Sequence, residues 1–334
     1  MAAKIARACA MRKFRVAGAG GGGPDGRDAR GFFMAARDWF WVFVLGIGWG
    51  STFYFNEVLL RALGPVSVST ARIGIAAITM WVMVLATGRS VRVPGRVLVQ
   101  MAVLGWAMFG LPFTIYPIGQ QVITSGAAGI INAMTPIMVV IVSHFWVGGE
   151  RATWGKSAGV AAGFAGIVLL SVPAMRGEGS SALWGLMFTL LAPLCYGTAV
   201  NYVRRLAGTD PWVMLTWAFT CAASGLAVVA ALREGAPGAL SGETWFAMAM
   251  VGCVLTAFAF IIFFWLLPRI GATSLSTVTF IAPISAVFLG VALLGETVDI
   301  WKAAGMGAIF VGLLLIDGRI LRLLGVGPKD QPTG

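Results

Sequence analysis

Apolar runs of about 20 residues recur along the chain, separated by short segments that carry charges, glycines or prolines. An α-helix needs about 20 mostly apolar residues to cross the hydrocarbon core of a bilayer. The pattern predicts ten transmembrane helices, at residues 39–58, 66–86, 97–119, 122–146, 154–173, 182–203, 212–232, 243–267, 271–294 and 299–323. The expected fold class is therefore an all-α polytopic membrane protein.

Composition supports this class. Of the 334 residues, 58% are hydrophobic and only 11% are charged, whereas soluble domains carry about 25% charged residues. This excludes a soluble enzyme, a coiled coil and a disordered chain. Residues 1–38 are rich in glycine and basic residues, so we expect a disordered tail there, and residues 325–334 form a short polar tail. Met34, directly before the first span, is an alternative translation start.

The net charge of +11 is concentrated in the tails and in short loops. No continuous basic face is available to a nucleic acid, so we expect lipid headgroups as the anionic partner and no nucleic acid. In alternate loops, one set holds Arg89, Arg92, Arg96, Arg151, Lys156, Arg204, Arg205 and Arg269, and both tails belong to this set. The positive-inside rule predicts a multi-pass protein of a bacterial-type inner (cell) membrane with both termini in the cytoplasm, which requires an even number of spans.

The chain repeats itself at an offset of about 146 residues, which divides it into halves at residues 39–173 and 182–324. The matched pairs include Pro136 with Pro283, Glu150 with Glu296, Lys156 with Lys302, and Gly50 with Gly197. Five spans in each half would insert the second copy upside down, as in transporters that open a site alternately to either side. The alternative is a duplication with a purely structural role. We expect the matched glycines to permit helix packing and the matched glutamates to cap loop ends.

Four stretches resemble a known family: GIGWGSTFYFNE (46–57), PVSVSTARIGIAAI (65–78), LPFTIYPIGQQVITSGAAGIINAMTP (111–136) and RIGATSLSTVTFIAPISAVFLGVALLGE (269–296). They are similar to the drug/metabolite transporter superfamily, and within it to ten-span carriers with two EamA-type domains. The resemblance implies two inverted five-helix repeats around a central cavity. It also implies that the protein moves amino acids, other small metabolites or drugs, commonly as an exporter.

Two ionisable residues are candidates for function. Arg72 lies about six residues inside the second predicted span, and a charged side chain at that depth costs several kcal/mol. We expect it to contact substrate or to gate; otherwise it reaches the outer interface or bonds the carbonyls of a neighbouring helix. His144, the only histidine, either couples transport to a proton or is a neutral hydrogen-bonding residue. The family pattern often has an arginine and a histidine at these places.

Uncharged polar and aromatic residues complete the candidate binding site. They are Trp49, Tyr54, Tyr116, Gln120, Asn132, Tyr196 and Trp265. Each either lines a cavity or bonds one helix to another. No carboxylate lies deep in a predicted span, so a small neutral or zwitterionic substrate carried by alternating access fits better than a cation.

Other functions find less support in the sequence. One histidine and no cluster of acidic residues argue against an enzyme, although a polytopic membrane enzyme and a non-transporting membrane protein stay as alternatives. The cysteines lack paired spacing, so we expect no metal site and no cofactor. The oligomeric state is open, a monomer included.

Overall fold

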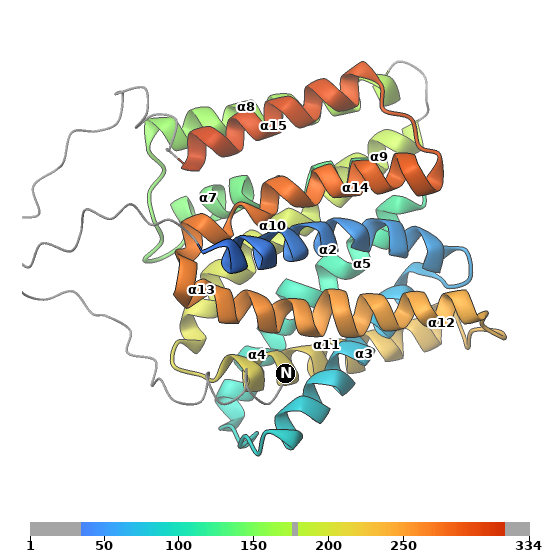
Figure 1. The fold of residues 1–334 in the computed structure, drawn as a ribbon, viewed down its shortest axis with the longest axis vertical. Coiled ribbons are helices and arrows are strands. Elements are labelled where there is room, and N and C mark those ends of the chain that lie inside the picture. Colours follow the sequence, from blue (N-terminus) through green and yellow to red (C-terminus); the bar gives the residue numbers. More distant parts are fainter. Residues whose placement is uncertain (1–34, 176–179, 318–334) are drawn as a thin grey trace, which may run out of the picture.

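The computed structural model describes residues 35–175 and 180–317 (Figure 1). The predicted N-terminal tail as far as residue 34, the alternative start at Met34, the end of the last predicted span and the tail at 325–334 lie outside the described residues. Helix α2 begins at Ala36, so the last part of the predicted tail belongs to the first helix instead.

The described residues form helices and no strand. In chain order these are α2 (Ala36–Leu60), α3 (Pro65–Ala86), α4 (Gly95–Gly105), η1 (Trp106–Gly110), α5 (Leu111–Gln120), α6 (Ser125–Asn132), α7 (Thr135–Phe145), α8 (Trp154–Pro173), α9 (Ser180–Thr189), α10 (Leu191–Tyr202), η3 (Val203–Leu206), α11 (Pro211–Arg233), α12 (Gly242–Ala249), η4 (Met250–Phe258), α13 (Ala259–Leu275), α14 (Val278–Leu294) and α15 (Ile300–Asp317). The result is a polytopic helical membrane fold, as predicted.

Eight helical segments in the described ranges are long and apolar enough to cross a bilayer. The predicted first span corresponds to α2, which has 25 residues. Its tryptophan, glycine and polar residues lower its mean hydropathy. The predicted ninth span corresponds to α14, which is apolar and has 17 residues. Gly271, with φ of 76°, breaks the helix between the predicted eighth and ninth spans. The count of ten spans stays a prediction.

Matched helices of the two halves run antiparallel where they meet. A Cβ added to Gly159 of α8 would lie 2.6 Å from the carbonyl oxygen of Gly312 on α15, and one added to Gly166 would lie 2.7 Å from that of Gly305. Residue numbers rise along one helix as they fall along the other, so α8 and α15 are antiparallel and their backbones touch. Figure 1 shows this pair at one edge of the molecule, with α3, α4 and α11 at the opposite edge.

Two parallel helix crossings also correspond under the repeat. Gly50 of α2 packs on α14, where an added Cβ would lie 1.7 Å from Ser285 Oγ. Gly197 of α10 packs on α7, where an added Cβ would lie 2.9 Å from the carbonyl oxygen of Met138. Small residues permit such close helix approach in a membrane. The structure therefore uses both matched glycines for packing.

Helices α3 and α11 run antiparallel, and polar contacts join them at both ends of the pair. At the start of α3, the Glu234 carboxylate accepts hydrogen bonds from the backbone N–H of Val66 (2.9 Å) and Ser67 (2.8 Å). At the other end, Arg89 forms an ion pair with Asp210, the N-cap residue of α11. Negative charge at a helix start satisfies unpaired N–H groups and the positive end of the helix dipole.

The Glu234 contact gives a first prediction. Glu234→Gln leaves one acceptor and turns an amide donor toward the second N–H group. We expect a loss of about 1–2 kcal/mol of stability, or about 2–6 °C in melting temperature, measured by thermal unfolding in detergent. The matched control is Glu243→Gln, an exposed carboxylate in the first turn of α12, which should melt like the parent. Equal melting of both variants would show that the Glu234 contact contributes nothing.

Candidate functional site

Arg72 lies inside the protein between elements of the two halves. Its side chain is on α3 and the residue is only 6% exposed. Arg72 Nε donates a hydrogen bond to Thr256 Oγ1 (3.0 Å), and the guanidinium carbon lies 3.6 Å from the centroid of the Phe113 ring. The side chain therefore turns toward neighbouring side chains and does not reach for the outer interface, which was one of the two alternatives.

Both partners of Arg72 lie at irregular helix segments. Thr256 is part of the π-helical segment η4, and Phe113 follows the π-helical segment η1 by three residues. Thr256 Oγ1 also donates to the carbonyl oxygen of Val251 (2.7 Å), so its one O–H donor is used and it faces Arg72 as an acceptor. π-Helical turns are rare and often mark functional sites. The segments η1 and η4 occupy corresponding positions in the two halves of the repeat. Arg72 therefore lies between one π-helical segment of each half.

The charge of Arg72 has no acidic partner within residues 35–175 and 180–317. Its Nε is bonded to Thr256, while its two terminal nitrogens donate no hydrogen bond to that part of the chain. Tyr116 and Tyr196 are its electrostatic neighbours. A buried charge is costly unless a counter-charge or hydrogen bonds satisfy it. Within the described ranges, the Arg72 terminal nitrogens therefore have neither a carboxylate nor a hydrogen-bond acceptor as partner.

Four other predicted residues lie near this arginine or contact its neighbours. Tyr116 Oη donates to Asn132 Oδ1 (2.8 Å), and the Tyr116 ring packs edge-on against Phe53. Tyr196 contacts both large apolar clusters of the core. Trp49 packs on aromatic rings of α13 in the cluster that also contains Phe113. We call Arg72, Trp49, Tyr116, Asn132 and Tyr196 the central site.

The remaining predicted residues lie elsewhere. Gln120 Nε2 donates to the carbonyl oxygen of Phe53 (2.8 Å), and its Oε1 accepts from Asn56 (3.0 Å), so this amide joins α5 to α2. Tyr54 belongs to an apolar cluster with the end of α2 and with α12. The guanidinium of Arg269 lies over the ring of Trp265, with 4.5 Å between the guanidinium carbon and the ring centroid. No hydrogen bond or ring contact among the described residues joins these three to Arg72, although Trp265 packs on the same apolar cluster as Trp49.

His144 is tied into the loop that follows α7. Its Nδ1 accepts a hydrogen bond from the backbone N–H of Ala152 (3.0 Å), and its carbonyl oxygen accepts from Arg151 (3.1 Å). An accepting Nδ1 carries no proton. In this structure the histidine bonds the loop, and its part in proton coupling stays a prediction.

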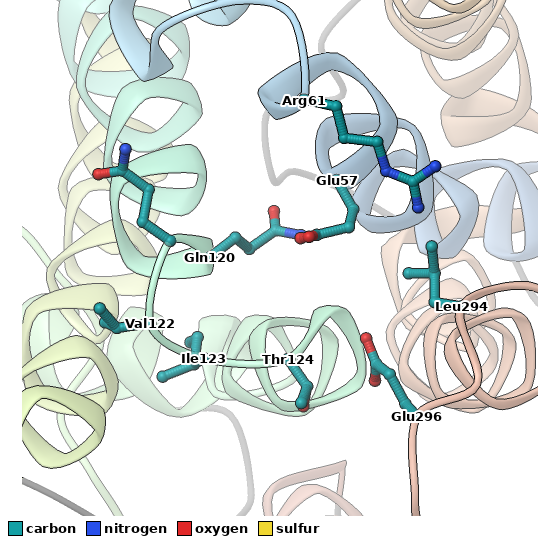
Figure 2. Close-up of a pocket in the computed structure, with 9 residues that line it drawn as sticks. Glu57, Arg61, Gln120, Val122, Ile123, Thr124, Leu294 and Glu296 are labelled. Atoms are coloured by element: carbon teal, nitrogen blue, oxygen red, sulfur yellow. The ribbon is translucent and has the colours of Figure 1, made fainter.

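A second site is a pocket of about 340 Å³ at the end of the molecule where α2 and α14 terminate (Figure 2). It is lined by Glu57, Arg61, Gln120, Gln121, Val122, Ile123, Thr124, Leu294 and Glu296. Figure 2 shows Glu57, on the last turn of α2, extending toward Gln120, with Arg61 directly after that helix and Glu296 across the pocket. Glu296 accepts hydrogen bonds from the backbone N–H of Ser125 (2.7 Å) and Gly126 (3.0 Å) at the start of α6. We call this cavity the end pocket.

The sequence analysis missed the partners of Arg72 and the end pocket. Thr256 and Phe113 stand in apolar runs where such residues are common, so neither gives a signal. Glu57 and Glu296 belong to separate halves, and only the matched position of Glu296 in the repeat pointed to a role for it.

Comparisons with known proteins agree with this fold. A crystal structure superposes on the chain with a TM-score of 0.63 at 21% identity and covers 87% of this chain and 99% of the other. That identity supports the fold alone.

Three curated relatives are transporters by name. The chain is 26% identical over 270 residues to the uncharacterized transporter YoaV of Bacillus subtilis, covering 80% of this chain and 92% of the relative. It is 24% identical over 283 residues to the uncharacterized inner membrane transporter YedA of Escherichia coli K12, covering 82% and 89%. It is 23% identical over 287 residues to a probable terminal-alkyne amino-acid exporter of Streptantibioticus cattleyicolor, covering 84% and 94%.

A family model for EamA-like transporters matches the chain twice, at residues 39–172 and 183–317. The two matches cover more than half of the chain and include every residue of the central site. The chain belongs to the EamA-like transporter family.

Proposed function

We propose that this protein exports a small organic solute across the inner (cell) membrane by alternating access around the central site. Family membership supports transport, and the relative named as an amino-acid exporter supports the substrate class and direction. The antiparallel packing of α8 with α15, and of α3 with α11, supports two inverted five-helix repeats. The distribution of basic loops supports both termini in the cytoplasm.

The unpaired charge of Arg72 is the observation on which this proposal mainly rests. A carboxylate can accept two parallel hydrogen bonds from a guanidinium, which is the strongest pairing available to a buried arginine. The described part of the chain offers Arg72 no such carboxylate. We infer that the substrate supplies it, as an amino acid or another small zwitterion would. We infer that the aromatic rings of the central site, those of Trp49, Tyr116 and Tyr196, receive the substrate's ammonium group.

Counterflow into proteoliposomes tests this function. We expect saturable uptake of labelled amino acids, and at least about tenfold slower uptake of the matching amino-acid amides, because the amide cannot pair with Arg72. The amide keeps the ammonium group and the side chain, so it isolates the carboxylate. Absence of saturable flux for every solute would overturn transport, whereas equal flux of acid and amide would overturn only the role of the carboxylate.

A further inference from the structure

Glu57 and Arg61 bring two opposite charges to the end pocket without pairing with each other. They are four residues apart at the end of α2, a spacing that favours an ion pair on a helix. Figure 2 shows the Glu57 side chain extending toward Gln120, and the Arg61 side chain extending toward the side of Leu294. Within residues 35–175 and 180–317, neither side chain forms an ion pair. The pocket therefore presents a negative and a positive group that have no charged partner in the described chain.

The third charge that lines the pocket, Glu296, already has partners. Its carboxylate accepts the hydrogen bonds from Ser125 and Gly126 at the start of α6. The positive end of the helix dipole offsets its negative charge there. Glu296 and Arg61 are both close enough to act electrostatically on Glu57. Because α6 holds Glu296, the charges that remain to bind a ligand are those of Glu57 and Arg61, which are opposite in sign.

The end pocket begins one helical turn beyond the central site. On α5, Gln120 of the pocket follows Tyr116 of the central site by four residues. On α2, Glu57 follows Phe53 by four residues, and the Phe53 ring packs on Tyr116. Four residues of an α-helix rise about 6 Å. Gln120 Nε2 also donates to the carbonyl oxygen of Phe53 (2.8 Å), which joins the two helices between the two sites. A solute that leaves the central site along α2 and α5 would enter the end pocket.

Apolar side chains form a wall of the pocket beside these charges. They belong to Val122, Ile123 and Leu294. Sites for small molecules typically combine an apolar lining with a few placed polar groups, and have volumes of about 300–1,000 Å³. The end pocket, at about 340 Å³, lies at the lower end of that range. Its size and chemistry fit a small molecule that carries an ammonium group, a carboxylate and an aliphatic side chain.

We propose that the end pocket is a second binding site for the transported amino acid, and that it selects aliphatic amino acids. Glu57 binds the ammonium group, Arg61 binds the carboxylate, and the apolar wall packs on the side chain. By the distribution of basic loops this end faces away from the cytoplasm, so an exported solute reaches the pocket after it leaves Arg72. The inference rests on the proposed transport function and adds to it a substrate class and an exit step.

The test measures how strongly a ligand protects a cysteine in the pocket from chemical labelling. The full-length chain carries serine at its native cysteines and Val122→Cys, at a lining position that is 37% exposed. It is reconstituted in liposomes and treated with a membrane-impermeant maleimide. The ligands are L-leucine, leucinamide, which lacks the carboxylate, and 4-methylpentanoate, which lacks the ammonium group. We expect leucine to slow labelling, and each analogue to need an about tenfold higher concentration for the same protection.

Two variants assign the two charges. Arg61→Gln should weaken protection by leucine about tenfold but should not weaken protection by leucinamide, which has no carboxylate. Glu57→Gln should weaken protection by leucine to a similar extent but should not weaken protection by 4-methylpentanoate. Neither parent side chain forms an ion pair with the described chain, so both variants should fold. Arg233→Gln and Glu243→Gln make the same charge changes at exposed positions that do not line the pocket, and ligands should protect them like the parent.

The outcomes that would overturn the proposal are specific. One is no protection by leucine. Another is equal protection by leucine and 4-methylpentanoate, which would show that the ammonium group is not bound. A third is protection by leucinamide as strong as by leucine, which would indicate a cation site.

Arg72→Gln separates the end pocket from the central site. Leucine should still protect the cysteine in this variant, although transport is slowed. Loss of protection would mean that labelling reports binding at the central site, and would overturn the second site while the transport function stands. Protection in the parent without saturable flux of any solute would have the reverse meaning, since the pocket would bind amino acids and the transport function would be wrong.

Discussion

Arg72→Gln is expected to lower kcat/KM for amino-acid counterflow about a hundredfold. Removing one partner of a buried, hydrogen-bonded charge pair costs about 2–5 kcal/mol, and tenfold in affinity corresponds to about 1.4 kcal/mol. Arg72→Lys keeps the charge but loses the bidentate fork and the Nε bond to Thr256. We expect it to fall between the parent and Arg72→Gln, mainly through a higher KM. Initial rates over a range of concentrations measure both.

Stability measurements distinguish binding from a structural role for Arg72. In the empty protein its charge has no acidic partner among the described residues, so its removal should leave the melting temperature unchanged or raise it. A purely structural arginine would lower it. Arg92→Gln makes the same charge change at an exposed loop position and should carry amino acids like the parent. If folded Arg72→Gln still favours amino acids over their amides, the assignment of Arg72 is wrong.

Gly50→Ala is expected to cause the largest loss of stability of any substitution considered. The new methyl group would lie 1.7 Å from Ser285 Oγ and 2.2 Å from the carbonyl oxygen of Ala282. Rotation of Ser285 would relieve only the first clash, because the second is with backbone. Helices α2 and α14 would have to separate, and overpacking of this kind costs about 1–3 kcal/mol or more. We expect a melting temperature lower by at least about 5 °C in detergent.

Two other glycines make the Gly50 experiment specific. At Gly74 of α3 an added Cβ meets nothing within 4 Å, so Gly74→Ala should be neutral or slightly stabilising, as alanine is the better helix former. At Gly197 the nearest contact would be 2.9 Å, so Gly197→Ala should fall between the two. A Gly50→Ala variant as stable as Gly74→Ala would contradict the close crossing of α2 and α14.

Several features were predictable because they depend on local pattern. Hydrophobic run length predicted the helices, since a bilayer demands about 20 apolar residues whatever surrounds them. Matched Pro, Gly and Glu positions predicted the repeat, and the stretches around residues 46–57 and 111–136 indicated the family that the comparisons identify. Arg72 stood out because a charge within an apolar run is costly and therefore rare. The number of spans was harder to predict, because α14 has only 17 residues and polar residues lower the hydropathy of α2.

Contacts between distant segments were beyond the reach of the sequence. Nothing near Arg72 in the chain indicates that Thr256 and Phe113 receive it, because helix packing sets those neighbours. The sequence selected Tyr116 because it is a polar or aromatic residue within a predicted span. The same criterion selected Tyr54, Gln120 and Trp265, which have other contacts. A span residue's type says that it needs a partner, but the rotation and crossing of helices decide which one it finds.

The sequence by itself determined the membrane class, the approximate helices, the duplicated halves and one buried charge, since each follows from the free energy of placing a residue type in lipid. Only the tertiary structure decided that this charge lies between the halves with no acidic partner among the described residues, and that Glu296 bonds the start of α6 while its match Glu150 pairs with Lys156. A repeat in the sequence does not fix these partners, because contacts between distant segments exist only after folding.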